Sequence, residues 1–122
     1  MEQIPPKLQN QIIQFQQVQQ QAQSISTQRM QLDLQLKELD RSISEVEKLD
    51  DKSEIYKNVG AILMKSDPPS ITVELHDKRE TFDLRIKTLT KQEKKIQKRL
   101  KEMQDKIQEE IKQGNINIPN LQ

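Results

Sequence analysis

The chain of 122 residues contains few side chains that could perform acid–base, nucleophilic or redox chemistry. His76 is its only histidine, and Asp77 and Glu80 follow it. A histidine beside carboxylates on a helix face lacks the nitrogen and sulfur partners of most metal sites, and it has no nucleophile to activate. We therefore interpret His76 as a solvated surface residue and not as a catalytic or metal site.

Other sources of chemistry are also missing from the sequence. Cysteine is absent, which excludes disulfides and thiolate ligands. The two glycines, Gly60 and Gly114, cannot form a phosphate-binding loop. We expect neither an enzyme nor a cofactor.

Charge gives little reason to expect nucleic acid or membrane as a partner. The net charge is +1, so the whole chain has no strong attraction to polyanions. Residues 91–101 are locally basic but include a glutamate and no aromatic residue, which is typical of a solvated helix face. The N-terminus has no signal-peptide pattern, and no stretch approaches the ~18 apolar residues of a membrane span. A soluble, cytoplasmic protein is expected.

Composition and periodicity predict long helices. Apolar residues make up 32% and charged residues 32%, with two glycines, which is a coiled-coil profile. Apolar residues recur at mostly alternating steps of three and four from Leu8 to Val46, with one repeated step of three at Phe15 and Val18, and again from Leu75 to Ile107. We predict a mainly α single domain over 1–122, a long antiparallel two-helix coiled coil with a central β-hairpin. Its expected elements are a helix at about 6–49, the hairpin at about 54–65, a helix at about 71–113 and a flexible tail at 114–122.

The two apolar stripes, here called seams, match each other in antiparallel register. Facing residues have numbers that sum to 121 or 122, as for Leu39 with Phe82 and Ile25 with Ile96. The charged interruptions Arg29 and Glu93 follow the same rule and are predicted to pair across the seam and fix its register. Arg79 has no such seam partner, and its charge is expected to lie in water.

The central stretch IYKNVGAILMK (residues 55–65) is predicted to be two short strands. Asn58, Val59 and Gly60 are the expected turn, since Asn and Gly tolerate positive φ. Because apolar residues point to both faces and an isolated hairpin is marginal in water, we predict that the hairpin is an oligomerisation surface. Its residues are Ile55, Tyr56, Val59, Gly60, Ile62, Leu63 and Met64.

The opposite end of the coiled coil, here called the tip, carries more apolar residues than a two-helix seam can bury. Exposed apolar groups at a fraying end can bind apolar segments of another chain. We predict that the tip binds apolar segments of another chain, with plain packing of the seam residues on one another as the alternative; the residues are Ile4, Leu8, Ile12, Ile13, Phe15, Ile107, Ile111, Ile116 and Ile118.

Three segments in this order and spacing resemble the β-type subunit of prefoldin. They are IPPKLQNQIIQFQQVQQQAQSISTQ, EIYKNVGAILMK and EKKIQKRLKEMQDKIQE, within residues 5–113. Only two strands fit between residues 51 and 70, which is similar to the β-type rather than the α-type subunit.

The resemblance implies an ATP-independent chaperone, and the chain resembles the archaeal members of the prefoldin family. It implies a hexamer of two α-type and four β-type subunits, assembled through the hairpins. The tips would hold non-native polypeptides for transfer to a group II chaperonin. Two alternatives remain open: a structural scaffold whose tips bind a folded partner, and a helical arm that grips nucleic acid, against which the mixed charges argue.

Overall fold

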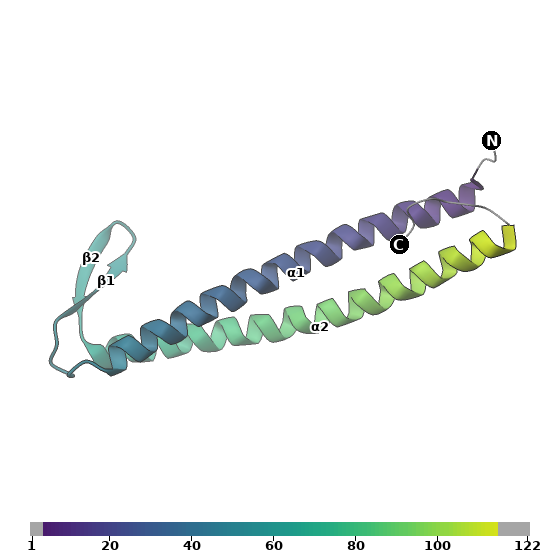
Figure 1. Cartoon of the computed structure of the whole chain (residues 1–122). Coiled ribbons are helices and arrows are strands. Elements are labelled where there is room, and N and C mark those ends of the chain that lie inside the picture. Colours follow the sequence, from purple (N-terminus) through teal and green to yellow (C-terminus); the bar gives the residue numbers. More distant parts are fainter. Residues whose placement is uncertain (1–3, 115–122) are drawn as a thin grey trace. The chain divides into compact units, whose positions relative to one another are not determined.

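The computed structural model describes residues 4–114 and consists of two long helices joined by a two-stranded sheet (Figure 1). The elements in chain order are α1 (Pro6–Glu47), β1 (Ile55–Val59), β2 (Ile62–Ser66) and α2 (Pro68–Gly114). The two helices pack together and the hairpin connects them, so the predicted fold class is confirmed. The predicted tail lies outside the described residues.

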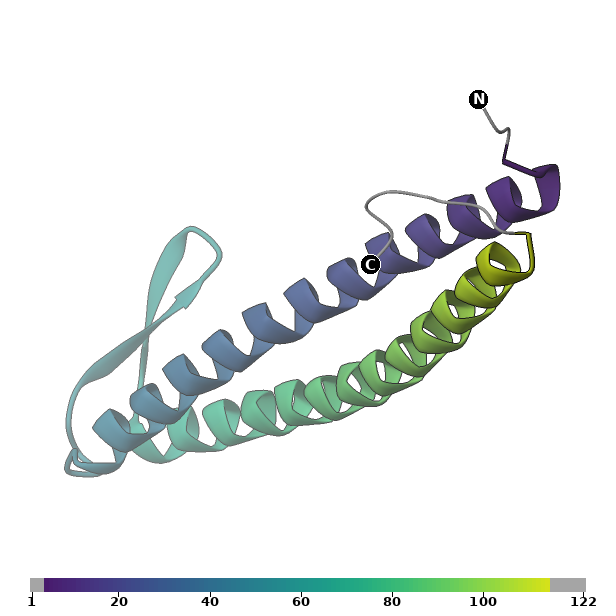
Figure 2. The ribbon, with the colours of Figure 1, turned by 45° about the vertical axis from the view of Figure 1, so that its right-hand side comes forward.

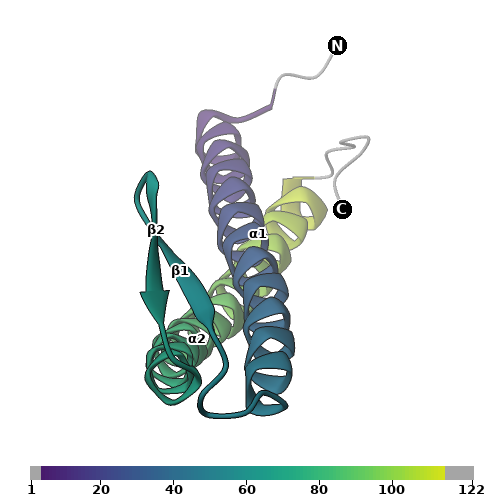
Figure 3. The same ribbon diagram turned by 90° about the vertical axis from the view of Figure 1, so that its left-hand side faces the viewer.

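The chain divides into two compact units. The tip unit comprises Met1–Gln28 and Leu89–Gln122, and the hairpin unit comprises Arg29–Thr88. In the tip unit the start of α1 and the end of α2 run side by side (Figures 1 and 2). In the hairpin unit the end of α1 packs beside the start of α2, and the β-hairpin connects them (Figure 3).

Glutamine does not prevent α1 from forming. Gln has a good helix propensity, and its long side chain bridges one helical turn. Gln23 donates a hydrogen bond to Thr27 at 3.4 Å, and Gln28 donates one to Ser24 at 3.2 Å. Such pairs at i, i+4 add modest helix stability. The Gln-rich tract is therefore helical while its apolar residues remain available for packing.

Helix α2 begins at Pro68, earlier than the predicted start at about residue 71. Asp67 caps it, since its carboxylate accepts hydrogen bonds from the Ser70 backbone N–H at 2.9 Å and the Ser70 hydroxyl at 3.0 Å. Proline is tolerated in the first turn because its missing N–H would have no helical partner there. Ser70 and Thr72 both lie inside the helix.

The hairpin turn is shorter than predicted. Asn58 pairs with Leu63, and Val59 pairs with Ile62, so both belong to the sheet. The two-residue loop is Gly60 and Ala61, and Gly60 has a φ of 60°. The favoured two-residue hairpin loops require positive φ at their first position, which glycine adopts without strain.

The seam of the hairpin unit is closed by Leu39 and Ile43, which are buried. Leu39 and Phe82 line one groove, as the predicted register requires. Arg79 has no partner on the seam, as predicted, but its charge forms an exposed ion pair with a residue beside the seam. Its Nε donates a hydrogen bond to Asp40 Oδ1 at 2.5 Å, and this raises the pKa of Arg79 further above its ordinary value.

Candidate interaction surfaces

The two faces of the hairpin both carry exposed apolar side chains. Successive residues of a strand point to opposite faces, so the pairs Tyr56–Lys65 and Asn58–Leu63 share one face. Tyr56 is 58% exposed and Leu63 is 68% exposed. The opposite face carries further exposed apolar residues, which are Val59, Ile62 and Met64. The exposed apolar residues among them, Tyr56, Val59, Ile62, Leu63 and Met64, all belong to the predicted oligomerisation surface. All five lie in the two strands of the hairpin.

One ion pair ties the hairpin to the helix that follows it. Lys57 Nζ lies 2.8 Å from Glu74 Oε1 of α2, and Lys57 shares its face with Ile55, which is half-buried. An exposed ion pair contributes little stability. The two-stranded sheet also leaves one unpaired edge on each strand. The chain alone therefore leaves the hairpin with open faces and open edges.

The apolar residues of the tip unit close on one another. Leu8 is 2% exposed, Phe15 is 5% exposed and Ile107 is 1% exposed, and they form one cluster. Half-buried apolar residues surround this cluster: Ile4, Ile12, Leu100, Met103 and Ile111. Lys7 lies 3.1 Å from Glu110 across the two helices. The predicted seam packing of Phe15 with Ile107 is thus present.

The predicted tip residues therefore differ in accessibility. Ile13 points away from the cluster and is 51% exposed, as its position off the seam predicts. Ile111 packs against the cluster and is half-buried. Ile116 and Ile118 lie outside the described residues.

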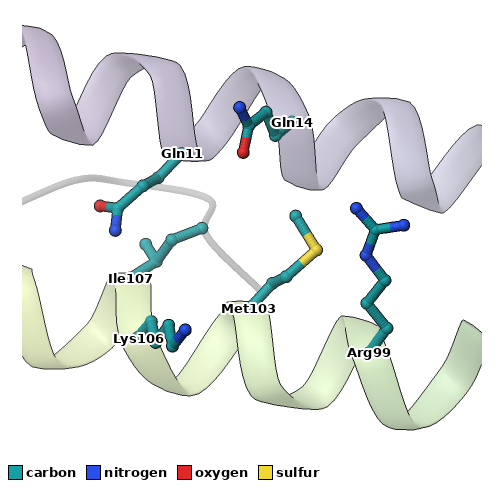
Figure 4. Close-up of a pocket in the computed structure, with 6 residues that line it drawn as sticks. All are labelled: Gln11, Gln14, Arg99, Met103, Lys106 and Ile107. Atoms are coloured by element: carbon teal, nitrogen blue, oxygen red, sulfur yellow. The ribbon is translucent and has the colours of Figure 1, made fainter.

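Two grooves run along the seam of the tip unit. The first groove has a volume of about 210 Å³ and is lined in part by the side chains of Arg99 and Met103, which project from α2 toward α1 (Figure 4). Its full lining is Gln11, Gln14, Arg99, Met103, Lys106 and Ile107. The second groove, of about 260 Å³, is lined by Ile25, Gln92, Lys95, Ile96 and Arg99. Ile25 and Ile96 face each other there, as the register predicts.

The polar lining of these grooves was not predicted from the sequence. Residues 91–101 were interpreted as a solvated face, and periodicity marks only the apolar seam positions. The available signal was the contrast between the two helices, because residues 8–28 of α1 carry no charge at all. Within the tip unit, residues 8–28 of α1 therefore offer no carboxylate to the cations of α2.

Other predicted sites have simple surroundings. His76 is exposed, and its Nε2 lies 3.5 Å from Glu47 Oε1. Arg29 is half-buried and lies 2.6 Å from Asp33 Oδ2. Arg29 and Glu93 belong to different units, and their pairing stays a prediction. Within residues 4–114, no group of acidic, histidine or cysteine residues could hold a metal ion. Over the same residues, neither helix has an apolar stretch long enough to cross a bilayer.

A two-helix fold with an exposed connecting hairpin defines a class of proteins that act through binding and assembly. The family model described as "Prefoldin subunit" matches residues 9–114. The chain is 43% identical over 108 residues to the prefoldin subunit beta of Archaeoglobus fulgidus, covering 88% of this chain and 93% of that protein. It is 38% identical over 112 residues to the prefoldin subunit beta of Thermococcus gammatolerans, covering 92% and 96%.

A solved structure agrees with these relatives. The crystal structure of the prefoldin beta subunit from Thermococcus strain KS-1 superposes with a TM-score of 0.82 at 36% identity, covering 89% of this chain and 96% of that chain. The chain therefore belongs to the prefoldin subunit family, as a beta subunit. This membership implies a chaperone role, and because the family is non-enzymatic it confirms that the chain is not an enzyme.

Proposed function

We propose that the chain is the β-type subunit of an ATP-independent holdase that acts in the cytoplasm. The hairpin unit would join it to an α-type prefoldin subunit and to further copies of itself, in a hexamer of two α-type and four β-type chains. The tip unit would capture non-native polypeptides and pass them to a group II chaperonin.

The observation that carries the assembly step is the exposure of the hairpin. Five large apolar side chains are exposed on it, and they occupy both faces. A two-stranded sheet with open faces is marginal by itself, and its edges pair readily with other strands. Pairing with hairpins of other subunits would bury these side chains and satisfy both edges.

The capture step is supported by the arrangement of the tip unit. Ile13 is exposed beside the closed cluster, and four further isoleucine and methionine side chains around it are only half-buried. Accessible apolar side chains of this kind offer sites for apolar segments of an unfolded chain. Each site would bind weakly, and several tips acting on one client would raise the affinity through effective concentration.

The assembly step is tested by mass measurements on hairpin variants mixed with an α-type subunit. Ile62→Gln combined with Leu63→Gln is expected to dissociate the complex. Leu34→Gln is a matched control, because Leu34 is an exposed apolar residue on α1 of the same unit. An unchanged mass for the hairpin variant, by light scattering, would refute assembly through the hairpin.

The capture step is tested by shortening the tip. Removing roughly the first dozen residues and those after Ile107 should leave the complex intact and abolish suppression of client aggregation. A shortened complex that still protects a denatured client fully would rule out capture at the tip. Competition by unrelated denatured proteins then separates a holdase from a scaffold that binds one folded partner, since only the holdase would release its client to them.

A further inference from the structure

The tip unit has an uneven charge distribution that its apolar packing does not explain. Residues 91–101 of α2 contain six cationic residues and one acidic residue, Glu93. Residues 8–28 of α1, which share the unit, contain no charged residue. Neighbouring helices of a coiled coil commonly carry complementary charges, and this pair of segments does not.

Two of these cations, Lys95 and Arg99, lie on one face of α2 with Lys106, and all three border the grooves. Lys95, Arg99 and Lys106 follow one another at steps of four and seven, which places them on the same side of a helix. Arg99 lines both grooves, so the grooves share one cationic rim. All three side chains are exposed, and within residues 4–114 none of them forms an ion pair.

The same grooves also have apolar side chains in their linings. Ile25 and Ile96 line the second groove, and Met103 and Ile107 line the first. Neither groove has a carboxylate in its lining. The first groove also includes Gln11, whose Oε1 is buried and has no hydrogen-bond partner among the described residues. A rotation of the Gln11 side-chain amide by 180° would let its oxygen accept a hydrogen bond from the backbone N–H of a bound peptide segment.

We propose that the two grooves select extended client segments in which acidic and apolar side chains alternate. Apolar side chains of the segment would enter the grooves, and its carboxylates would contact Lys95, Arg99 and Lys106. This inference rests on the proposed capture of non-native polypeptides and names the class of segment that is captured. Arginine at the shared position suits such a role, because its planar guanidinium binds a carboxylate through two hydrogen bonds.

A polypeptide fits this surface better than a nucleic acid. Proteins that bind single-stranded nucleic acid stack bases on aromatic side chains beside a basic groove. The only aromatic residue of the described tip unit is Phe15, which is buried. The grooves instead offer aliphatic and thioether side chains, for which a base has no stacking surface.

The test measures binding of three labelled peptides of about a dozen residues to the full-length chain by fluorescence anisotropy. All three share the same leucines, which alternate with Glu, Gln or Lys. The Glu peptide is expected to bind about tenfold more tightly than the Gln peptide, since three exposed ion pairs together supply roughly this factor. The difference should shrink from about 50 to about 300 mM salt because of screening.

A variant without the three groove cations and a matched control test whether the preference for the Glu peptide arises at the grooves. Lys95→Gln, Arg99→Gln and Lys106→Gln together should bring the Glu peptide down to the affinity of the Gln peptide. Lys94→Gln, Lys98→Gln and Lys101→Gln remove the same charge from other faces of α2 and should retain most of the preference. Circular dichroism checks that both variants keep their helix content.

Each result decides the proposal. Equal affinity for the Glu and Gln peptides would overturn the charge selection but leave apolar capture intact. Binding to none of the peptides would overturn both the selection and the proposed capture at the tip. Equal losses in the two triple variants, or tighter binding of an oligouridylate of similar length than of the Glu peptide, would also overturn it.

Discussion

The closed cluster of the tip unit makes a quantitative prediction about Ile107. This side chain is 1% exposed and packs against Leu8 and Phe15. Replacing it with alanine removes buried methyl and methylene groups and leaves a cavity between two helices. Comparable core truncations lower the free energy of unfolding by about 2–5 kcal/mol. We expect Ile107→Ala to fall in that range.

The control is Leu84→Ala on the same helix. Leu84 is 58% exposed, and alanine is the best helix former, so the change should stay within about 0.5 kcal/mol. Urea unfolding followed by circular dichroism measures both variants. The chain concentration must be the same in every experiment, because subunit assembly adds to the apparent stability.

A double variant tests whether the cluster is a unit. Phe15→Ala and Ile107→Ala should not be additive, with a coupling of about 0.5–3 kcal/mol, as found for residues in contact. Amide exchange in residues 6–15 should accelerate in the single Ile107 variant, since the cluster holds this end of α1 to α2. If Ile107→Ala and Leu84→Ala had equal small effects, the closed cluster would be wrong.

Three further predictions concern a helix cap, the hairpin turn and an ion pair of the hairpin unit. Asp67→Ala should destabilise the start of α2, whereas Asp67→Asn should retain the cap. Hydrogen bonds from Ser70 lower the pKa of Asp67 below its ordinary 3.8, so the stability that the ionised cap contributes is present above pH 3.8 and is lost as the pH falls through the lowered pKa. Thermal melting at a series of pH values measures this loss. Gly60→Ala should weaken the hairpin by about 1–2 kcal/mol through its positive φ alone, since no atom lies near the added Cβ, and strand amide exchange would report it. Asp40→Asn should lower the melting temperature slightly at low salt and not at high salt, because its pair with Arg79 is exposed.

Much of the fold follows from the sequence because it depends on periodicity. Alternating steps of three and four define a seam whatever the polar residues are, and the matched sums place Leu39 with Phe82 and Ile25 with Ile96. The strands follow from β-branched and apolar residues between two breaks. These features need only spacing and propensity, both of which are local.

The features that the sequence did not predict depend on three-dimensional surroundings. The predicted start of α2 at about residue 71 lies beyond the proline pair that follows Asp67, although prolines in a first turn are compatible with a capped helix. Arg79 meets Asp40, which is not a seam position, so heptad spacing alone does not pair them. The inward position of Ile111 and the cationic rim around Arg99 depend on which side of each helix faces the other.

The two units differ in how they arrange the apolar residues that a two-helix seam cannot bury. The apolar side chains of the hairpin are exposed on both faces, while those of the tip unit close into a cluster with an accessible margin. The first arrangement suits permanent pairing with other subunits, and the second suits transient contacts with changing clients. Substitutions in one unit are therefore expected to affect one activity and spare the other.

The most direct test of the proposed chaperone function is a light-scattering measurement without nucleotide. A chemically denatured client is diluted into buffer that contains the chain assembled with an α-type subunit. We expect aggregation to be suppressed in proportion to the amount of complex, with no requirement for ATP. Unchanged aggregation at a several-fold excess of an intact complex would contradict the holdase function.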